Sequence, residues 1–212
     1  MGASSPLRVL WRDGPTDSSR CAVTTVILAG GLGTRIGGAK GLRMLHGRML
    51  IDWVLDAVRD QSEEILINAN HPCDAYEHFG YKVVVDQTQD FLGPLAGVQS
   101  ALRCACHDFI VSVPCDTPFL PRNLISNLFR AVTVKSTTEV AVAVVTGKRQ
   151  PTIAIYRKSL LPQLDAYLGS GGRGVGAWLE TLRVGELVLD DTMAFSNINT
   201  LDDLQLASQA HK

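Results

Sequence analysis

The alternation of short apolar runs with segments of helical periodicity most restricts how this 212-residue chain can fold. Runs rich in β-branched residues predict strands at residues 23–28, 64–69, 82–85, 109–113, 140–145, 152–156 and 184–189. Apolar residues at helical spacing predict helices at residues 49–60, 94–105, 121–134, 160–168 and 174–182, and a last helix starting at Thr200. Strands and helices in alternation form a mostly parallel sheet covered on both faces. The chain is therefore expected to be an α/β protein with a three-layer α/β/α, Rossmann-like architecture.

Length and composition are typical of one globular domain, since 46% of the residues are hydrophobic and 19% are charged. No repeat or low-complexity block divides the sequence. Residues 1–22 mix serine, proline, glycine and aspartate, which predicts a disordered extension before a single domain at residues 23–212. No apolar run approaches the roughly 20 residues that a membrane-spanning helix needs.

Net charge and cysteine usage exclude several classes of partner and site. The formal net charge of -1 gives no basic footprint for nucleic acid or for an anionic membrane. The five cysteines are an odd number, and the C-x-C pair of Cys104 and Cys106 lacks zinc-type spacing. Free thiols are typical of a reducing compartment, so the sequence indicates a cytoplasmic protein. His46 and His107 have no partners at recognisable spacing and are expected to be structural or surface residues.

A glycine-rich segment, residues 28–40, follows the first predicted strand and contains five glycines. Glycine lets the backbone approach a ligand without a Cβ atom, so successive N–H groups can surround a phosphate. Arg35 and Lys40 add positive charge to the segment. Neither of two common nucleotide motifs fits, because Ala39 stands where a P-loop has lysine and Ile36 where the dinucleotide fingerprint has glycine. The segment therefore predicts a phosphate-binding loop of another kind.

Polar residues lie where several of the predicted strands end. Asn68 lies near the end of one strand, Asp86 follows the next, and Asp116 comes between two prolines after a third. Ligands of open α/β sheets bind beyond the carboxyl ends of the strands, so we expect these side chains to share a site with the glycine loop. The two prolines hold the Asp116 carboxylate in a fixed position, and such a carboxylate is a suitable ligand for Mg²⁺. A turn aspartate that caps the next helix would have the same sequence pattern.

These motifs together resemble the signature of nucleotidyltransferases with a GT-A-like fold, and in particular the MobA family of molybdenum cofactor guanylyltransferases. The resemblance begins in the glycine loop and continues in order through Asn68-Ala69-Asn70, Asp86, residues 93–97, residues 114–118, Pro151-Thr152 and residues 197–200. It covers the chain from about Val23 to the end. The loop differs in one respect, because the family usually has Gly-Gly-x-Asp-Lys-Gly and this chain has Gly38-Ala39-Lys40, one residue shorter and without the aspartate.

The resemblance implies transfer of GMP from GTP to molybdenum-loaded molybdopterin, giving the guanine dinucleotide form of the cofactor and pyrophosphate. It assigns catalysis to Arg35, Lys40 and Asp116, with Asp116 as the ligand of Mg²⁺. It assigns contact with GTP to Leu28, Ala29, Gly30, Gly31, Lys40, Asn68, Asp86 and Asp116, where Asp86 accepts from the guanine N–H groups. It places Gly93, Gly97, Arg173, Asn197 and Asn199 on the pterin side. No serine, cysteine or histidine stands beside a base as a nucleophile, which fits direct transfer to a substrate phosphate.

Other interpretations of the same residues stay open. Gly97 could instead allow close packing of its helix, and Arg173 could be a solvated loop residue. Asn197 and Asn199 could stabilise the fold and not bind substrate. The alternative enzymes are a CTP-dependent molybdopterin cytidylyltransferase and a sugar-phosphate nucleotidyltransferase. The shortened loop favours a third alternative, a catalytically inactive GTP-binding regulatory protein. We expect a monomer whose protein partners, by the resemblance, are molybdenum-insertion proteins and molybdoenzyme chaperones.

Overall fold

A computed structural model describes residues 6–11, 21–30, 39–70, 73–87, 93–189, 193–195, 198 and 203. Its main feature is an eight-stranded sheet of order β1-β10-β8-β9-β7-β2-β5-β6. The strands are β1 (Leu7–Leu10), β2 (Cys21–Leu28), β5 (Ser62–Asn68), β6 (Lys82–Val84), β7 (Phe109–Pro114), β8 (Val140–Val145), β9 (Lys148–Arg157) and β10 (Val184–Leu189). Within this sheet β9 runs antiparallel to β7 and β8, and every other pairing is parallel.

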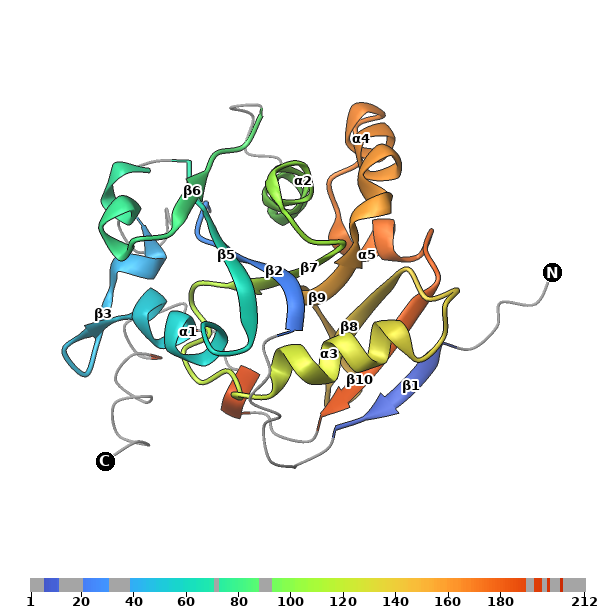
Figure 1. The fold of residues 1–212 in the computed structure, drawn as a ribbon, viewed down its shortest axis with the longest axis horizontal. Coiled ribbons are helices and arrows are strands. Elements are labelled where there is room, and N and C mark those ends of the chain that lie inside the picture. The colour runs from blue at the N-terminus through green and yellow to red at the C-terminus, as the bar shows by residue number, and fades with distance from the viewer. Residues whose placement is uncertain are drawn as a thin grey trace.

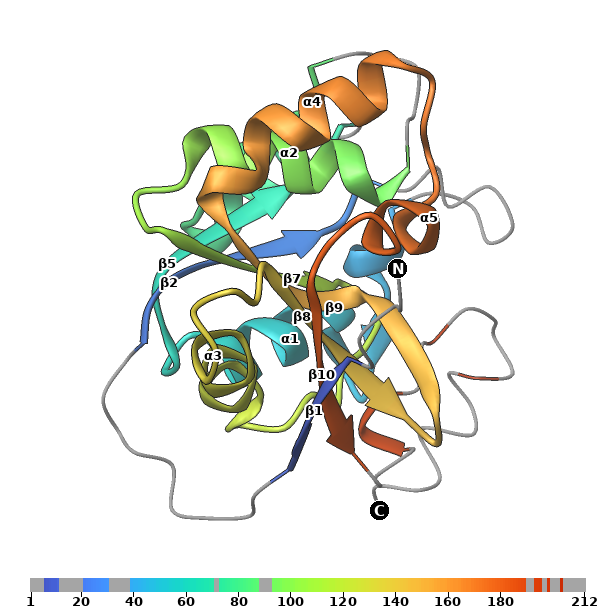
Figure 2. The same cartoon turned by 90° about the vertical axis from the view of Figure 1, so that its right-hand side faces the viewer.

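Helices cover both faces of the sheet, so the predicted three-layer α/β/α arrangement is confirmed (Figure 1). The helices are α1 (Leu50–Val58), α2 (Pro94–Cys104), α3 (Leu124–Thr133), α4 (Leu161–Gly169) and α5 (Val175–Leu179). Figure 2 shows α2 and α4 on one face of the sheet and α1 and α3 on the other. None of the described helices combines the length and apolar character that a membrane crossing requires.

Two apolar cores, one on each face, hold the layers together. Alternate residues of the strands point to opposite faces, so Val26 of β2 packs with α2 and α4 while its neighbour Ile27 packs with α1 and α3. Both side chains are fully buried. Because the strands are apolar on both faces, they read as nearly continuous hydrophobic runs, which is why the sequence predicts their positions well.

One predicted boundary is wrong at the amino terminus. The composition of residues 1–22 predicts disorder, but Leu7–Leu10 form β1, which pairs in parallel with β10 in the register Leu7↔Gly185 to Leu10↔Val188. The strand satisfies backbone groups along the outer edge of β10, and Arg8 forms an ion pair with the buried Glu186 at 3.0 Å. A four-residue strand is too short to stand out in a polar segment, and its partner residues lie 178 positions away along the chain.

Strand β9 is longer than the predicted residues 152–156. It starts at Lys148 because Thr146 and Gly147, both with positive φ, form a two-residue turn that pairs Val145 directly with Lys148. The predicted helix at residues 174–182 is shorter and spans Val175–Leu179. The helix predicted from Thr200 lies outside the described residues, apart from the helical Asp203.

Candidate active site

A pocket of about 270 Å³ opens where β2, β5, β6 and β7 reach their carboxyl ends. It is lined by Leu28, Ala29, Gly30, Lys40, Asn68, Asp86, Gly93, Pro94, Pro114, Cys115, Asp116 and Thr152. The start of the glycine loop and the polar residues predicted at the strand ends therefore meet in one cavity. This is the edge at which open α/β sheets bind their ligands.

Asp116 is the buried charge of the pocket, with 6% of its surface exposed. Its Oδ2 accepts a hydrogen bond from Lys40 Nζ at 3.3 Å. Its Oδ1 is buried and has no hydrogen-bond partner within the part of the chain that the structure describes. Leaving a buried carboxylate oxygen unsatisfied is unfavourable, so this atom is suited to contact a cation or a donor that arrives with a ligand.

The shortened loop still brings Lys40 to Asp116. Lys40 begins the short 3₁₀ helix η2 (Lys40–Leu42), whose second residue, Gly41, is buried. A Cβ atom at Gly41 would lie 3.1 Å from Tyr76 Oη and 3.3 Å from Cys115 Cβ, closer than ordinary contact. Glycine at this position therefore lets η2 pack tightly between Tyr76 and Cys115, which places the Lys40 ammonium beside the carboxylate.

Cys115 lines the pocket but does not have the character of a nucleophile. Burial first, and then the neighbouring Asp116 carboxylate, raise the pKa of its thiol to about 12. The thiol is consequently protonated at neutral pH, whereas a nucleophilic cysteine needs a lowered pKa. The buried state of Cys115 agrees with the absence of a nucleophile motif in the sequence.

On the other side of the pocket, three polar residues from the ends of β5 and β6 form a hydrogen-bonded network. Asn68 Nδ2 donates to Asp86 Oδ1 at 2.9 Å and to the Val84 carbonyl oxygen at 3.2 Å. Asn70 Nδ2 donates to Asp86 Oδ2 at 2.8 Å. Each oxygen of the Asp86 carboxylate thus accepts one amide hydrogen, and further lone pairs remain for a ligand in the pocket.

Two glycines at the start of α2 contribute in different ways. Gly93 precedes the helix with φ 75°, a conformation that favours glycine, and it lines the pocket. Gly97 lies one turn later, where a Cβ atom would come within 2.8 Å of both Asn68 Cγ and Leu28 Cδ2. Close packing of α2 against β2 and β5 therefore requires glycine at position 97, as one of the two open interpretations predicts.

Comparison with known proteins identifies the family. The family model of the MobA-like NTP transferase domain matches residues 25–185. The chain belongs to this family. A molybdenum cofactor guanylyltransferase from Cupriavidus taiwanensis is 41% identical over 193 residues, covering 88% of this chain and 96% of the relative. A molybdenum cofactor guanylyltransferase from Shewanella putrefaciens is 38% identical over 185 residues, covering 86% of this chain and 94% of the relative.

A solved structure agrees with this membership. Molybdopterin-guanine dinucleotide biosynthesis protein A from Archaeoglobus fulgidus is 25% identical, with a TM-score of 0.74 over 88% of this chain and 97% of that one. The MobA-like transferase described here therefore has the GT-A-like nucleotidyltransferase fold that its motifs predict. Its sheet, with helices on both faces, presents the pocket at the same edge as the predicted nucleotide loop.

The structure describes most of the predicted site residues, but not all of them. Gly31, Arg35, Asn197 and Asn199 lie outside the described residues. Ile198, between the two asparagines, donates its backbone N–H to the Asp116 carbonyl oxygen at 2.8 Å. Ile198 of the MobA-like transferase thus lies on the Asp116 side of the pocket.

Arg173 is not in the described lining of the pocket. Its Nη1 donates to the carbonyl oxygens of Leu168, at 2.9 Å, and Gly172, at 2.6 Å, at the end of α4. These bonds are those of an arginine that caps a helix carboxyl terminus. The structure therefore gives Arg173 a structural partner, and its assignment to the pterin side stays a prediction.

Sequence reasoning missed two contributors to this site. Asn70, which holds Asp86, and Thr152 of β9, which lines the pocket, both belong to motifs of the resemblance, but neither residue is assigned a role by it. A signal for Asn70 was present, since it lies two residues after Asn68 and residues at this spacing share a face of an extended chain. Thr152 could not be found this way, because its position depends on the antiparallel placement of β9 beside β7.

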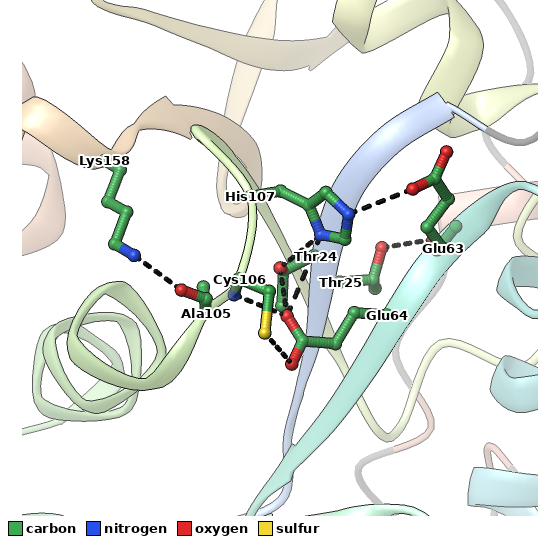
Figure 3. Close-up of polar contacts among 9 residues, drawn as sticks. Thr24, Thr25, Glu63, Glu64, Ala105, Cys106, His107 and Lys158 are labelled. Carbon is green, nitrogen blue, oxygen red and sulfur yellow. Dashed lines mark hydrogen bonds and ion pairs between the residues drawn. The ribbon is translucent and has the colours of Figure 1, made fainter.

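A separate polar cluster, centred on Glu64, lies toward the amino-terminal ends of the strands, away from the pocket (Figure 3). Glu64 accepts hydrogen bonds from the Thr24 hydroxyl at 2.5 Å, the Cys106 N–H at 2.8 Å and the Cys106 thiol at 3.3 Å. His107 Nε2 lies 3.1 Å from a carboxylate oxygen of Glu63. Partial burial alone would raise the pKa of Glu64, but the bonds from Cys106 and Thr24, with the charge of His107, together lower it. His107 thus contributes to a structural cluster at the edge away from the pocket.

Proposed function

We propose that this protein transfers GMP from GTP to molybdopterin, giving molybdopterin guanine dinucleotide and pyrophosphate. The observation that carries the proposal is the buried Asp116 Oδ1, which has no partner among the described residues and lies beside Lys40 in the pocket that also contains Asn68 and Asp86. The guanylyltransferase relatives, similar over nearly their whole length, support the choice of GTP and molybdopterin.

The proposed roles rest on the positions of the described residues around the pocket and, for Gly31 and Arg35, on the resemblance of the glycine loop alone. The backbone of Leu28, Ala29, Gly30 and Gly31 holds the nucleotide, and Lys40 with Arg35 binds its phosphates. Asn68 and Asp86, which lie across the pocket from Asp116, hold the nucleoside. A carboxylate accepts hydrogen bonds but donates none, so Asp86 suits the N–H groups of guanine.

The Asp116 side of the pocket fits a divalent cation, for which we propose Mg²⁺. Magnesium prefers oxygen ligands, keeps several waters and shares substrate phosphates, so a single buried carboxylate with a free oxygen is a suitable anchor. No cluster of three or more acidic, histidine or cysteine side chains able to hold a metal occurs among the described residues. The remaining ligands would be the phosphates of GTP and water. When bound, the ion neutralises charge on the phosphates during transfer.

The chemistry needs no covalent intermediate on the protein. A phosphate oxygen of molybdopterin attacks the α-phosphorus of GTP, a new O–P bond forms, and the bond to the bridging oxygen of the leaving pyrophosphate breaks. Lys40, 3.3 Å from Asp116, is placed to stabilise the negative charge of the phosphates while the glycine loop orients them. Gly93, Gly97, Arg173, Asn197 and Asn199 are assigned to the pterin side, where Gly93 contributes through the pocket lining.

The test is incubation of the protein with molybdopterin and each Mg²⁺–NTP in turn, with the product identified by mass. GTP is expected to give the guanine dinucleotide and pyrophosphate. Asp116→Ala should abolish Mg²⁺-dependent turnover and keep the wild-type circular dichroism spectrum. Asp108→Ala, which removes a carboxylate before β7 instead of after it, is the matched control and should keep activity.

Two outcomes would contradict the proposal. Turnover with CTP in preference to GTP would identify a cytidylyltransferase. Tight GTP binding without pyrophosphate release, whichever acceptor is supplied, would identify the inactive regulatory protein that the shortened loop allows.

A further inference from the structure

We propose that Asn70 is a specificity-determining positioning residue, which fixes the Asp86 carboxylate in the orientation that recognises guanine. The inference rests on the proposed function, because it assumes that Asp86 accepts hydrogen bonds from the base of GTP. Asn68 and Asp86 belong to the described lining of the pocket and Asn70 does not. Asn70 would therefore act through Asp86 and without touching the nucleotide.

The side chain of Asn70 is bound to Asp86 at two points. Its Nδ2 donates to Asp86 Oδ2 at 2.8 Å, and its Oδ1 accepts from the Asp86 backbone N–H at 2.9 Å. The two bonds connect one amide to both the main chain and the carboxylate of the same residue. The main-chain bond fixes the Asn70 amide in place, so that its Nδ2 holds Oδ2 while Asn68 holds Oδ1, and the two bonds to the carboxylate together restrain its rotation about the Cβ–Cγ bond.

The donors and acceptors also determine which way the two amides point. The Asp86 N–H can only donate, so it must face the oxygen of Asn70, and the Asn70 nitrogen must then face the carboxylate. The Val84 carbonyl can only accept, so Asn68 likewise turns its nitrogen toward Val84 and Asp86. Neither amide can be flipped without opposing two donors or two acceptors. The arrangement therefore has one consistent hydrogen-bond pattern.

Asn70 also connects Asp86 to the loop that follows β2. A Cβ atom at Gly30 would lie 3.2 Å from Asn68 Oδ1 and 3.2 Å from Asn70 Nδ2. Gly30 lets the loop backbone pack directly on the two amides. Gly30, the first residue after Ala29 at the end of β2, thus packs on the same two amides that hold the Asp86 carboxylate.

A fixed carboxylate matters because guanine presents two donors, its ring N1–H and its exocyclic amine, along one edge. Two hydrogen bonds to one carboxylate form together only when its plane is aligned with that edge. Asn68 holds Oδ1 and Asn70 holds Oδ2, so the plane is set before the nucleotide binds. Pre-orientation of a binding group by a second residue is a general source of specificity.

The decisive comparison is between GTP and inosine triphosphate, which lacks the exocyclic amine. We would measure kcat/KM for both nucleotides with molybdopterin in the wild type, in Asn70→Asp and in Gln87→Glu. Asn70→Asp keeps the size and the acceptor of the side chain but replaces its donor with a charge that repels Asp86. Gln87→Glu places the same charge on the exposed residue next to Asp86 and leaves both amides intact.

The wild type should prefer GTP over inosine triphosphate, and Asn70→Asp should reduce this preference about tenfold to hundredfold, the loss expected for a hydrogen bond to a charged group. Gln87→Glu should keep the wild-type preference. If Asn70→Asp does not fold, Asn70→Ala replaces it, because alanine removes the amide without adding charge. The ratio of kcat/KM for GTP to kcat/KM for inosine triphosphate is then compared with that of the wild type.

Equal losses with both nucleotides would show that Asn70 is merely structural and would overturn the inference. A wild type without preference between the two would overturn it as well. A wild type that does not use GTP at all would instead contradict the proposed function, so the two failures are distinguishable.

Discussion

Replacing Gly97 by alanine tests whether α2 packs against the floor of the pocket as closely as the structure indicates. The added Cβ would lie 2.8 Å from Leu28 Cδ2 and 2.8 Å from Asn68 Cγ, and closer still to Asn68 Oδ1, whereas ordinary contacts are 3.4–4 Å. Gly97 and Asn68 are both buried. The helix must therefore shift outward, or Asn68 must leave its bonds to Val84 and Asp86.

The size of the effect follows from three contributions. Overpacking a dense core destabilises a protein by about 1–3 kcal/mol. Weakening the two hydrogen bonds of Asn68, to Val84 and Asp86, adds about 1 kcal/mol. Alanine favours the helix over glycine by about 1 kcal/mol, which partly offsets these losses. The net expectation is a loss of about 2 kcal/mol, or about 4–8 °C in Tm for a chain of this length.

The assay is urea unfolding of the wild type, Gly97→Ala and Gly176→Ala. Gly176 lies in α5, where no atom of the described residues comes within 4 Å of a Cβ position, so alanine there should be neutral or stabilising by up to about 1 kcal/mol. In an Asn68→Ala background Gly97→Ala should be at least about 1 kcal/mol less harmful, because the Asn68 oxygen and Cγ are gone and, of the three closest contacts, only that with Leu28 remains. If Gly97→Ala were as stable as Gly176→Ala, the packing explanation would be refuted.

Three further predictions concern charged groups. Because the pKa of Glu64 is lowered from 4.5 in the folded state, its contribution to stability is complete above that value and is lost as the pH falls toward the folded-state pKa. Urea unfolding at about pH 6 and about pH 4 should thus show the difference between wild type and Glu64→Gln shrinking on acidification. Glu64 also raises the pKa of the Cys106 thiol, so in a Cys104→Ser background Glu64→Gln should accelerate iodoacetamide labelling of Cys106 at neutral pH. Lys40→Met should lower kcat for nucleotidyl transfer about 100-fold or more, as expected for a lost charge in the transition state, while an unchanged kcat would remove Lys40 from the mechanism.

Much of the fold could be predicted because the strands are buried on both faces. Val140–Val145 is a continuous apolar run with every residue buried, and its predicted and observed limits are identical. Val184–Leu189 is likewise found where it was expected. The limits of helices are less well predicted, since α3 begins at Leu124 and not at residue 121. Pro121 suits the first turn of a helix, but it begins a turn in which its carbonyl oxygen accepts from the Leu124 N–H at 3.1 Å, and the helix starts after that turn.

The features that sequence could not predict depend on partners distant along the chain. The strand at Leu7–Leu10 exists because β10 offers it an edge, and Thr152 enters the pocket because β9 is antiparallel. The tight packing of Gly41 against Tyr76 and Cys115 likewise joins three separate segments. Composition and periodicity report only local structural preferences, so they do not predict contacts between distant segments of the chain.

Glu64 and Asp116 lie toward opposite ends of the strands and differ in how many hydrogen bonds their carboxylates accept. This difference predicts that replacing each carboxylate by its amide changes the free energy of unfolding in opposite directions. Glu64 accepts three hydrogen bonds, so Glu64→Gln should lower the free energy of unfolding by about 1–3 kcal/mol. Among the described residues, the buried Asp116 Oδ1 has no partner, and Oδ2 accepts a hydrogen bond from Lys40. Asp116→Asn therefore removes an unfavourable buried charge and should be neutral or stabilising in metal-free buffer. Urea unfolding of both variants makes the comparison. If Asp116→Asn lost as much stability as Glu64→Gln, Asp116 would be a structural carboxylate. If it gained stability and lost activity, the unsatisfied oxygen would be the part of the site kept free for a ligand.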